Sequence, residues 1–309
     1  MHKDFTSYNG RISYLSGLNK AAKYLEIGVW GGGTFFPVEI PFKVAVDPCF
    51  VFKSSEHRKN GTHFFEITSD AFFKKLDQGD LEIQKISANE PIKFDIIFID
   101  GYHTFEQSFR DFENSLRYSH EKTLWLIDDT VPSDAYSALS NPEISRYKRN
   151  RAGLDRGDWH GDVYKTIFAI HDHFPEISYC TLMGGNPQTV LWKAGRSTRA
   201  PLFSSISEIE SVSYYDMIQH GKVMMPIADE TLPEYIFRSI DPALEAAPDS
   251  WKQVITKPNF RNISPEVTLM DRLVVSCKQS VPARAYRKFN KDGLGAVLNT
   301  IKNKLRENS

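Results

Sequence analysis

The sequence has few cysteines, no long apolar run and almost no net charge. Its three cysteines, Cys49, Cys180 and Cys277, form no Cys-x-x-Cys pair, which argues against a disulfide framework or a zinc knuckle and favours a reducing cytosol. The sequence contains no run of about 18 apolar residues of the kind that would predict a membrane span. The first residues also lack the apolar core of a signal peptide. A formal net charge of −1 creates no field that draws the chain to nucleic acid. We therefore expect a cytoplasmic protein without a transmembrane segment or a nucleic-acid partner.

What is present is an ordinary globular composition, with 41% hydrophobic and 25% charged residues, and a regular alternation of short apolar runs with amphipathic stretches. The predicted strands span residues 23–29, 43–47, 63–67, 94–100, 123–128, 177–183 and 188–193. The predicted helices span 11–23, 69–76, 105–116 and 162–173. Residues 132–161 are expected to form a long polar loop. Alternating strands and helices predict a parallel sheet with helices on both faces.

The last two predicted strands are joined by Gly184-Gly185-Asn186-Pro187, which is a hairpin signal. The hairpin adds an antiparallel strand, so the fold class is α/β with a doubly wound, seven-stranded mixed sheet. We expect an N-terminal helical lead over 1–22, the sheet domain over 23–199 and an appendage over 200–309. The appendage ends in a basic tail with leucines at helical spacing. Packing on the protein is the favoured role for that tail, and contact with an anionic membrane surface is the alternative.

Two predicted strands stop abruptly at carboxylates. The run 95–99 ends at Asp100 and is followed by His103, and the run 124–127 ends at Asp128 and Asp129. Strands buried on both faces read as continuous apolar runs, and open parallel sheets bind ligands at the carboxyl ends of their strands. If the two strands are neighbours, these three acids and one histidine converge on a small active site.

The first predicted strand leads into a glycine-rich segment, residues 26–34, and Asp47 ends the second strand. Glycines at that place permit a tight turn and a close approach of the backbone to a nucleotide. An acid at the end of the next strand can accept hydrogen bonds from both ribose hydroxyls. Together they favour a nucleoside cofactor over a structural turn.

The segments 26–32, 46–48, 94–103 and 127–130 resemble the class I S-adenosylmethionine-dependent methyltransferases, which have a Rossmann-like sheet. The closest type is methyltransferase family 24, similar to metal-dependent catechol and macrolide-sugar O-methyltransferases. The resemblance covers about residues 20–195, including the final hairpin, and leaves out the C-terminal third. It implies that the cofactor's methionine part, ribose and adenine are bordered by Glu26, Gly28, Gly32, Asp47, Ser69, Asp70 and Asp100.

The resemblance also implies a divalent metal ion at the acids. Mg²⁺ prefers oxygen ligands and is usually held by one or two carboxylates, which Asp100, Asp128 and Asp129 offer. The ion would lower the pKa of an acceptor hydroxyl, and His103 would take its proton. The plain alternative is that these acids cap helices or pair with loop arginines, and that His103 is a capping or cofactor-side residue.

Residues 158–165 form a second candidate segment. Trp159 is expected either to wall the acceptor site or to pack in the interior, and His160 is a rival base. Asp162 is expected to be the N-cap of the following helix. The arginines of the preceding loop are expected to be solvated rather than to attract an anionic acceptor.

The predicted function is transfer of a methyl group to a hydroxyl of a sugar, polyol or secondary metabolite. Three alternatives stay open: a metal-independent methyltransferase, a nicotinamide-dependent oxidoreductase, and a non-catalytic scaffold. The expected partner is a small-molecule or glycan acceptor, and the sequence leaves a homodimer open.

Overall fold

The computed structural model describes residues 7–86, 91–154, 158–183, 185–195, 201–224 and 227–228. All of them belong to one compact unit, Met1–Pro265. The basic tail beyond residue 278 and most of the predicted appendage lie outside the described residues.

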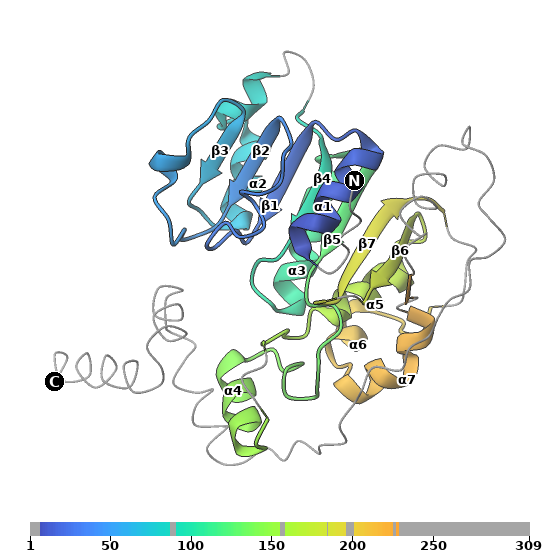
Figure 1. The fold of residues 1–309 in the computed structure, drawn as a ribbon. Helices are drawn as coiled ribbons and strands as arrows, with labels where there is room; N and C mark the ends of the chain where they lie inside the picture. Colours follow the sequence, from blue (N-terminus) through green and yellow to red (C-terminus); the bar gives the residue numbers. More distant parts are fainter. Residues whose placement is uncertain are drawn as a thin grey trace, which may run out of the picture. The chain divides into compact units, whose positions relative to one another are not determined.

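The centre of the described structure is one mixed sheet (Figure 1). Its strands are β1 Lys23–Ile27, β2 Phe42–Val46, β3 Thr62–Phe65, β4 Phe94–Ile99, β5 Ser119–Ile127, β6 Ile177–Leu182, β7 Gln188–Lys193 and β8 Ile227–Ala228. They lie in the order β3-β2-β1-β4-β5-β7-β6-β8. Strand β7 runs antiparallel to both of its neighbours, and every other neighbouring pair is parallel. The predicted seven-stranded mixed sheet is confirmed, with the two-residue β8 added at its edge.

Helices surround the sheet, and most of them begin where the sequence supplies a side-chain cap. They are α1 Tyr8–Asn19, α2 Ser69–Gln78, α3 Phe105–Leu116, α4 Pro142–Arg151, α5 Tyr164–His173, α6 Ile206–Glu210 and α7 Tyr214–Met224, with short 3-10 turns at Ser54–His57 and Glu82–Ile86. The hydroxyls of Thr68 and Thr104 accept hydrogen bonds from the first turns of α2 and α3. These contacts satisfy backbone donors that a helix start otherwise leaves without partners.

Two hydrophobic cores lie on the two faces of the sheet. Aromatic residues of α2, α3 and α5, among them Phe72, Phe112 and Phe168, pack in one core with the inward side chains of β4 and β5. The other core contains Ile12 and Leu15 of α1. Because both faces are covered, the central strands are apolar along nearly their whole length, and polar groups gather at the strand ends.

Three local predictions are wrong. The predicted polar loop 132–161 contains α4, which starts with Pro142 directly after the capping side chain of Asn141, a helix-start signal that the loop assignment passed over. The lead helix starts earlier than predicted, at Tyr8. Asp162 does not cap α5, which begins after Val163 without a side-chain cap. Its Oδ1 instead accepts the backbone N–H of Phe105 at 2.8 Å, so it caps α3.

The described start of the predicted appendage continues the core of the sheet domain. Ile209 of α6 and Met217 of α7 are buried in the same core as Phe168. The assignment of 200–309 as a separate part stays a prediction. Within the described ranges, no helix is long and apolar enough to cross a membrane.

Candidate active site

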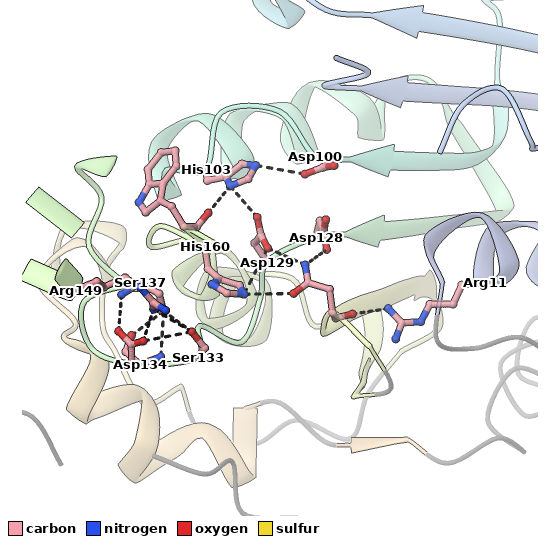
Figure 2. Close-up of polar contacts among 12 residues, drawn as sticks. Arg11, Asp100, His103, Asp128, Asp129, Ser133, Asp134, Ser137, Arg149 and His160 are labelled. Atoms are coloured by element: carbon pink, nitrogen blue, oxygen red, sulfur yellow. Dashed lines mark hydrogen bonds and ion pairs between the residues drawn. The ribbon is translucent and has the colours of Figure 1, made fainter. Parts of the chain in front are cut away.

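The register of β4 on β5 brings the predicted acids together. Ile99 pairs with Ile127 in the parallel ladder, so Asp100 and Asp128 leave the sheet side by side. The backbone N–H of Asp128 still donates to the Ile99 carbonyl at 3.0 Å, which continues the ladder to the strand end. Asp129 follows with a left-handed backbone, φ 57°. The convergence expected from the two strand ends is therefore present (Figure 2).

His103 lies between two of these carboxylates. Its Nδ1 is 2.7 Å from Asp129 Oδ2, and its Nε2 is 3.3 Å from Asp100 Oδ1. The backbone carbonyl of Trp159 lies 2.9 Å from the same Nδ1. The three side chains offer ligand atoms that all lie within 4.8 Å of one another. Asp128 is not part of that group, although it borders it.

His160 approaches the cluster from the segment before α5. Its Nε2 is 3.3 Å from the side-chain oxygen of Asn186 and 3.8 Å from Asp129 Oδ1. Its Nδ1 is buried and has no hydrogen-bond partner among the described residues. The His160 side chain is 7% exposed, against 26% for His103. A bound acceptor can thus reach His103 more easily than His160.

Sequence reasoning missed Asn186, which precedes β7. Its Nδ2 donates to Asp129 Oδ1 at 2.9 Å and to Asp128 Oδ1 at 3.2 Å. The Gly-Gly-Asn-Pro sequence signalled only a turn, and no chemical motif marks the asparagine. Only the antiparallel return of β7 beside β5 places it under the acid pair.

Helix α1 supplies two more residues that the sequence did not indicate. Arg11 is fully buried, and its Nη1 donates to the Asn186 carbonyl at 2.6 Å and to Gln188 Oε1 at 3.0 Å. Burial and the neighbouring carboxylates, Asp128 first, raise the pKa of the Tyr8 phenol, which also hydrogen-bonds Asn186. Tyr8 is therefore a neutral hydroxyl at the edge of an acidic cluster.

The cluster carries more negative than positive charge, and its pKa values reflect this. Burial raises the pKa of Asp100 to about 6, and burial with the charge of Asp100 holds that of Asp128 well above its usual range. Burial also opposes ionisation of Asp129, but His103 outweighs it and lowers the pKa. Burial alone would lower the pKa of His103, yet Asp129 and Asp100 keep it well above its ordinary value.

The glycine-rich segment packs directly against the acid site. Gly28 has φ 89°, and a Cβ there would lie 1.8 Å from the backbone oxygen of Asp100. Gly32 has φ 75°, and a Cβ there would meet the Phe36 ring at 2.1 Å. Both positions therefore require glycine. The turn after β1 and the end of β4 form one continuous surface.

Asp47 ties this turn to the end of β2. Its two carboxylate oxygens accept the backbone N–H groups of Trp30 and Cys49, each at 2.7 Å. A carboxylate can accept several hydrogen bonds at once, and the role of Asp47 at a ribose stays a prediction. Glu26 is buried and accepts the Tyr24 hydroxyl at 2.5 Å. Burial holds the pKa of Glu26 well above its usual range.

The predicted adenine-side residues begin α2. The Ser69 hydroxyl accepts from Gln107 Nε2 at 3.2 Å, and Asp70 pairs with Arg110 Nε at 3.1 Å. Gln107 also donates to Asp111 at 3.0 Å. The role of Ser69 and Asp70 in cofactor binding stays a prediction.

Trp159 stacks on His103, with ring centroids 5.2 Å apart and an interplanar angle of 19°. Its indole N–H donates to the Leu139 carbonyl at 2.6 Å. The next glycine, Gly161, has φ 64°, and a Cβ there would lie 1.6 Å from the His103 carbonyl oxygen. The segment that carries Trp159 and His160 is thus packed tightly on His103.

A buried ion pair helps to hold the segment of Trp159 and His160 in place. Arg149, predicted as a solvated loop residue, lies on α4 and pairs with the carboxylate of Asp134. Asp134 also accepts the backbone N–H of Ser137, whose carbonyl in turn accepts the N–H groups of His160 and Gly161. The arginine therefore has a structural role here.

Comparison with known proteins gives one family. A family model described as a methyltransferase domain, family 24, matches residues 25–130. The match runs from β1 to just past β5, and so includes the glycine-rich turn, Asp47 and the three clustered acids. No curated protein matches the chain.

Several solved structures are similar at low identity. An O-methyltransferase from Bacillus cereus in complex with SAH shares 16% identity at a TM-score of 0.42, over 60% of this chain and 80% of that one. The O-methyltransferase TomG from Streptomyces achromogenes shares 14% at 0.40, over 60% and 79%. The MycE methyltransferase from the mycinamycin biosynthetic pathway, in complex with Mg and SAH, shares 16% at 0.39, over 66% and 58%.

The family match and the sheet order agree with each other. The family model covers the strands that bear the glycine-rich turn and the acids, and the antiparallel β7 inserted between β5 and β6 is the hairpin expected of this class of sheet. Residues 25–130 thus match a methyltransferase domain, and the mixed sheet has the Rossmann-like fold of the class I methyltransferases.

Proposed function

We propose that this protein methylates a hydroxyl oxygen of a sugar, polyol or secondary metabolite, and that the cluster of Asp100, His103 and Asp129 is its acceptor site. One observation carries the proposal. The cluster lies at the end of β4, and Gly28 of the cofactor turn packs against the backbone of Asp100. Methyl transfer is an in-line displacement, so a proton acceptor next to the cofactor turn is what the reaction needs.

His103 is the proposed general base in its neutral form. Because Asp129 and Asp100 raise its pKa, it can accept a proton only above that pKa or when a bound cation offsets their charge. Asp129 accepts Nδ1–H at the shorter distance, 2.7 Å, and so orients the ring and stabilises the imidazolium that forms on proton uptake. The more distant Nε2, 3.3 Å from Asp100, is the nitrogen that an acceptor hydroxyl would approach. His160 is the rival base, but its Nε2 is occupied by Asn186 and its Nδ1 is inaccessible.

We propose that a divalent cation assists this reaction. Asp100 and Asp129 would hold it, with Asp128 adjacent, and bound Mg²⁺ would lower the pKa of the acceptor hydroxyl and orient it. The donor set fits, because two carboxylates, those of Asp100 and Asp129, face one imidazole and offer ligand atoms within 4.8 Å of one another. The same geometry supports a second candidate, in which His103 and its two carboxylates act without a metal ion.

The test combines methyl transfer with chelation. The full-length protein is incubated with methyl-labelled S-adenosylmethionine and a panel of sugars, polyols and phenols, first as prepared and then after exhaustive chelation. We expect label in at least one hydroxyl compound, loss of transfer after chelation and recovery with Mg²⁺. Full activity in the metal-free enzyme would refute the metal and leave the second candidate.

Paired histidine variants identify the base. We expect His103→Gln to lower kcat by about 100-fold or more, the usual contribution of a general base, with little change in the affinity for S-adenosylhomocysteine. The matched change His160→Gln should lower kcat less. A larger loss of kcat in His160→Gln than in His103→Gln would identify His160 as the base.

Ligand-dependent thermal shifts test the other classes of function. Stabilisation by S-adenosylhomocysteine is expected, because a ligand that binds only the folded state raises its stability. Stabilisation by a nicotinamide dinucleotide instead would favour an oxidoreductase, and no shift with either would favour a scaffold. A cytoplasmic location and a homodimer stay predictions.

A further inference from the structure

Asn186 has an unusual set of contacts for a residue in a hairpin turn. Its side-chain nitrogen faces two carboxylates, Asp129 at 2.9 Å and Asp128 at 3.2 Å, and its side-chain oxygen faces His160 Nε2 at 3.3 Å. A turn needs none of these contacts. All three contacts are to residues in or next to the candidate acceptor site.

The orientation of the amide follows from the chemistry of its neighbours. An ionised carboxylate only accepts hydrogen bonds, so the group that faces Asp129 at 2.9 Å must be the NH2. The amide oxygen then faces His160 and can only accept. The contact at 3.3 Å therefore requires a proton on His160 Nε2.

The backbone of Asn186 has a separate task. Its carbonyl oxygen accepts from Arg11 Nη1 at 2.6 Å, and the same guanidinium nitrogen donates to Gln188 Oε1 at 3.0 Å. This anchor between α1 and the hairpin does not involve the Asn186 side chain. Substitutions at position 186 can therefore remove the amide and keep the anchor.

We propose that Asn186 is a positioning residue of the acceptor site, whose one amide holds Asp128 and Asp129 together and fixes the ring of His160. The proposal rests on the proposed methyl transfer. Two adjacent carboxylates repel each other, and a shared N–H donor offsets that repulsion while setting their separation. Partners that orient the residues of a site in this way typically change activity or metal affinity about 10- to 100-fold when they are lost.

Two variants separate the two contacts. Asn186→Ala removes both, together with the hydrogen bond to Tyr8, whereas Asn186→Asp keeps the shape and an acceptor for His160 but replaces the shared donor with a third carboxylate. Gln188→Leu is the matched control, because it removes a side-chain contact of the same Arg11 without touching an acid. Binding of S-adenosylhomocysteine, measured by calorimetry, checks that each variant retains the folded cofactor site.

The first readout is independent of activity. In the full-length protein with 15N-labelled histidine, long-range 1H–15N spectra report which ring nitrogen carries the proton, and His160→Gln identifies the signals. We expect a single Nε2–H form in the wild type, a mixture of forms in Asn186→Ala, and wild-type signals in Gln188→Leu. Unchanged His160 signals in Asn186→Ala would overturn the orientation of His160 by Asn186.

The second readout is methyl transfer. Both Asn186 variants should lower kcat about 10- to 100-fold with an unchanged KM for S-adenosylmethionine, and Gln188→Leu should stay within about threefold. Wild-type kcat in Asn186→Asp would overturn the role at the acid pair. If the wild type methylates no acceptor, the proposed function fails by itself, and the histidine spectra still decide whether Asn186 orients His160.

Discussion

Replacing Asp111 with asparagine should make the protein more stable near neutral pH. Asp111 lies on α3, is 1% exposed, and accepts Gln107 Nε2 at 3.0 Å. Burial raises the pKa of its carboxyl group from 3.8 to about 7, although Ser69 and Gln107 counteract this through hydrogen bonds. Asparagine keeps the shape and the acceptor oxygen but cannot ionise, so it removes the cost of burying a charge.

The sign and size follow from proton linkage. The folded state binds the Asp111 proton more tightly than the unfolded state does, so this group lowers stability as the pH rises from about 4 to about 7. The pKa of Asp111 differs by about 3 between the unfolded and the folded state, and each pKa unit corresponds to 1.36 kcal/mol. Above pH 7 the ionised Asp111 therefore destabilises the folded state by at most about 4 kcal/mol. Between pH 5 and pH 8 the free energy of unfolding of the wild type should fall by about 3 kcal/mol relative to the variant.

Urea denaturation of both proteins at several pH values between 5 and 8 measures this difference. Asp70→Asn is the control, since Asp70 belongs to the same group of side chains but is 47% exposed and paired with Arg110. An exposed ion pair contributes about 0–1 kcal/mol. The free energy of unfolding of the control should therefore change with pH in the same way as that of the wild type. A pH-independent difference between Asp111→Asn and the wild type would refute the reasoning.

Three further changes test the scaffold of the site. Gly28→Ala should prevent folding or lower the Tm sharply, because its Cβ would lie 1.8 Å from a backbone oxygen, whereas Gly33→Ala, with nothing within 4 Å, should melt like the wild type. Asp47→Asn should weaken S-adenosylhomocysteine binding in calorimetry by about tenfold, since one charge-assisted acceptor is lost; unchanged affinity would remove Asp47 from the cofactor site. Arg149→Met should cost about 3–5 kcal/mol in urea denaturation by leaving Asp134 buried without its cation, and adding Asp134→Asn should recover much of that loss. An equally unstable double variant would contradict the ion-pair explanation.

The fold could be predicted from the sequence because its signals are local. The apolar runs of β4 and β5, the glycines after β1 and the hairpin before β7 each lie within a few residues. The carboxyl ends of parallel strands share one edge of a sheet. That rule suffices to bring Asp100 to Asp128 and Asp129, and to place the glycine-rich turn beside them.

The side-chain pairings could not be predicted in the same way. Asp162 caps α3 across 57 residues, and Asn186 reaches the acid pair across 57 and 58. Which carboxylate faces His103, and which faces Asn186, depends on backbone angles such as the left-handed φ of Asp129. Hydropathy patterns carry no information on such contacts.

The sequence by itself therefore determined the sheet, the glycine-rich turn and the presence of acids at one edge, since these follow from periodicity and chain direction. Only the tertiary structure decided that His103 lies between Asp100 and Asp129 and that Asn186 joins Asp129 to Asp128. The physical reason is that hydrogen bonds depend on distances of about 3 Å between atoms far apart in the chain. Those distances exist only once the two hydrophobic cores have packed.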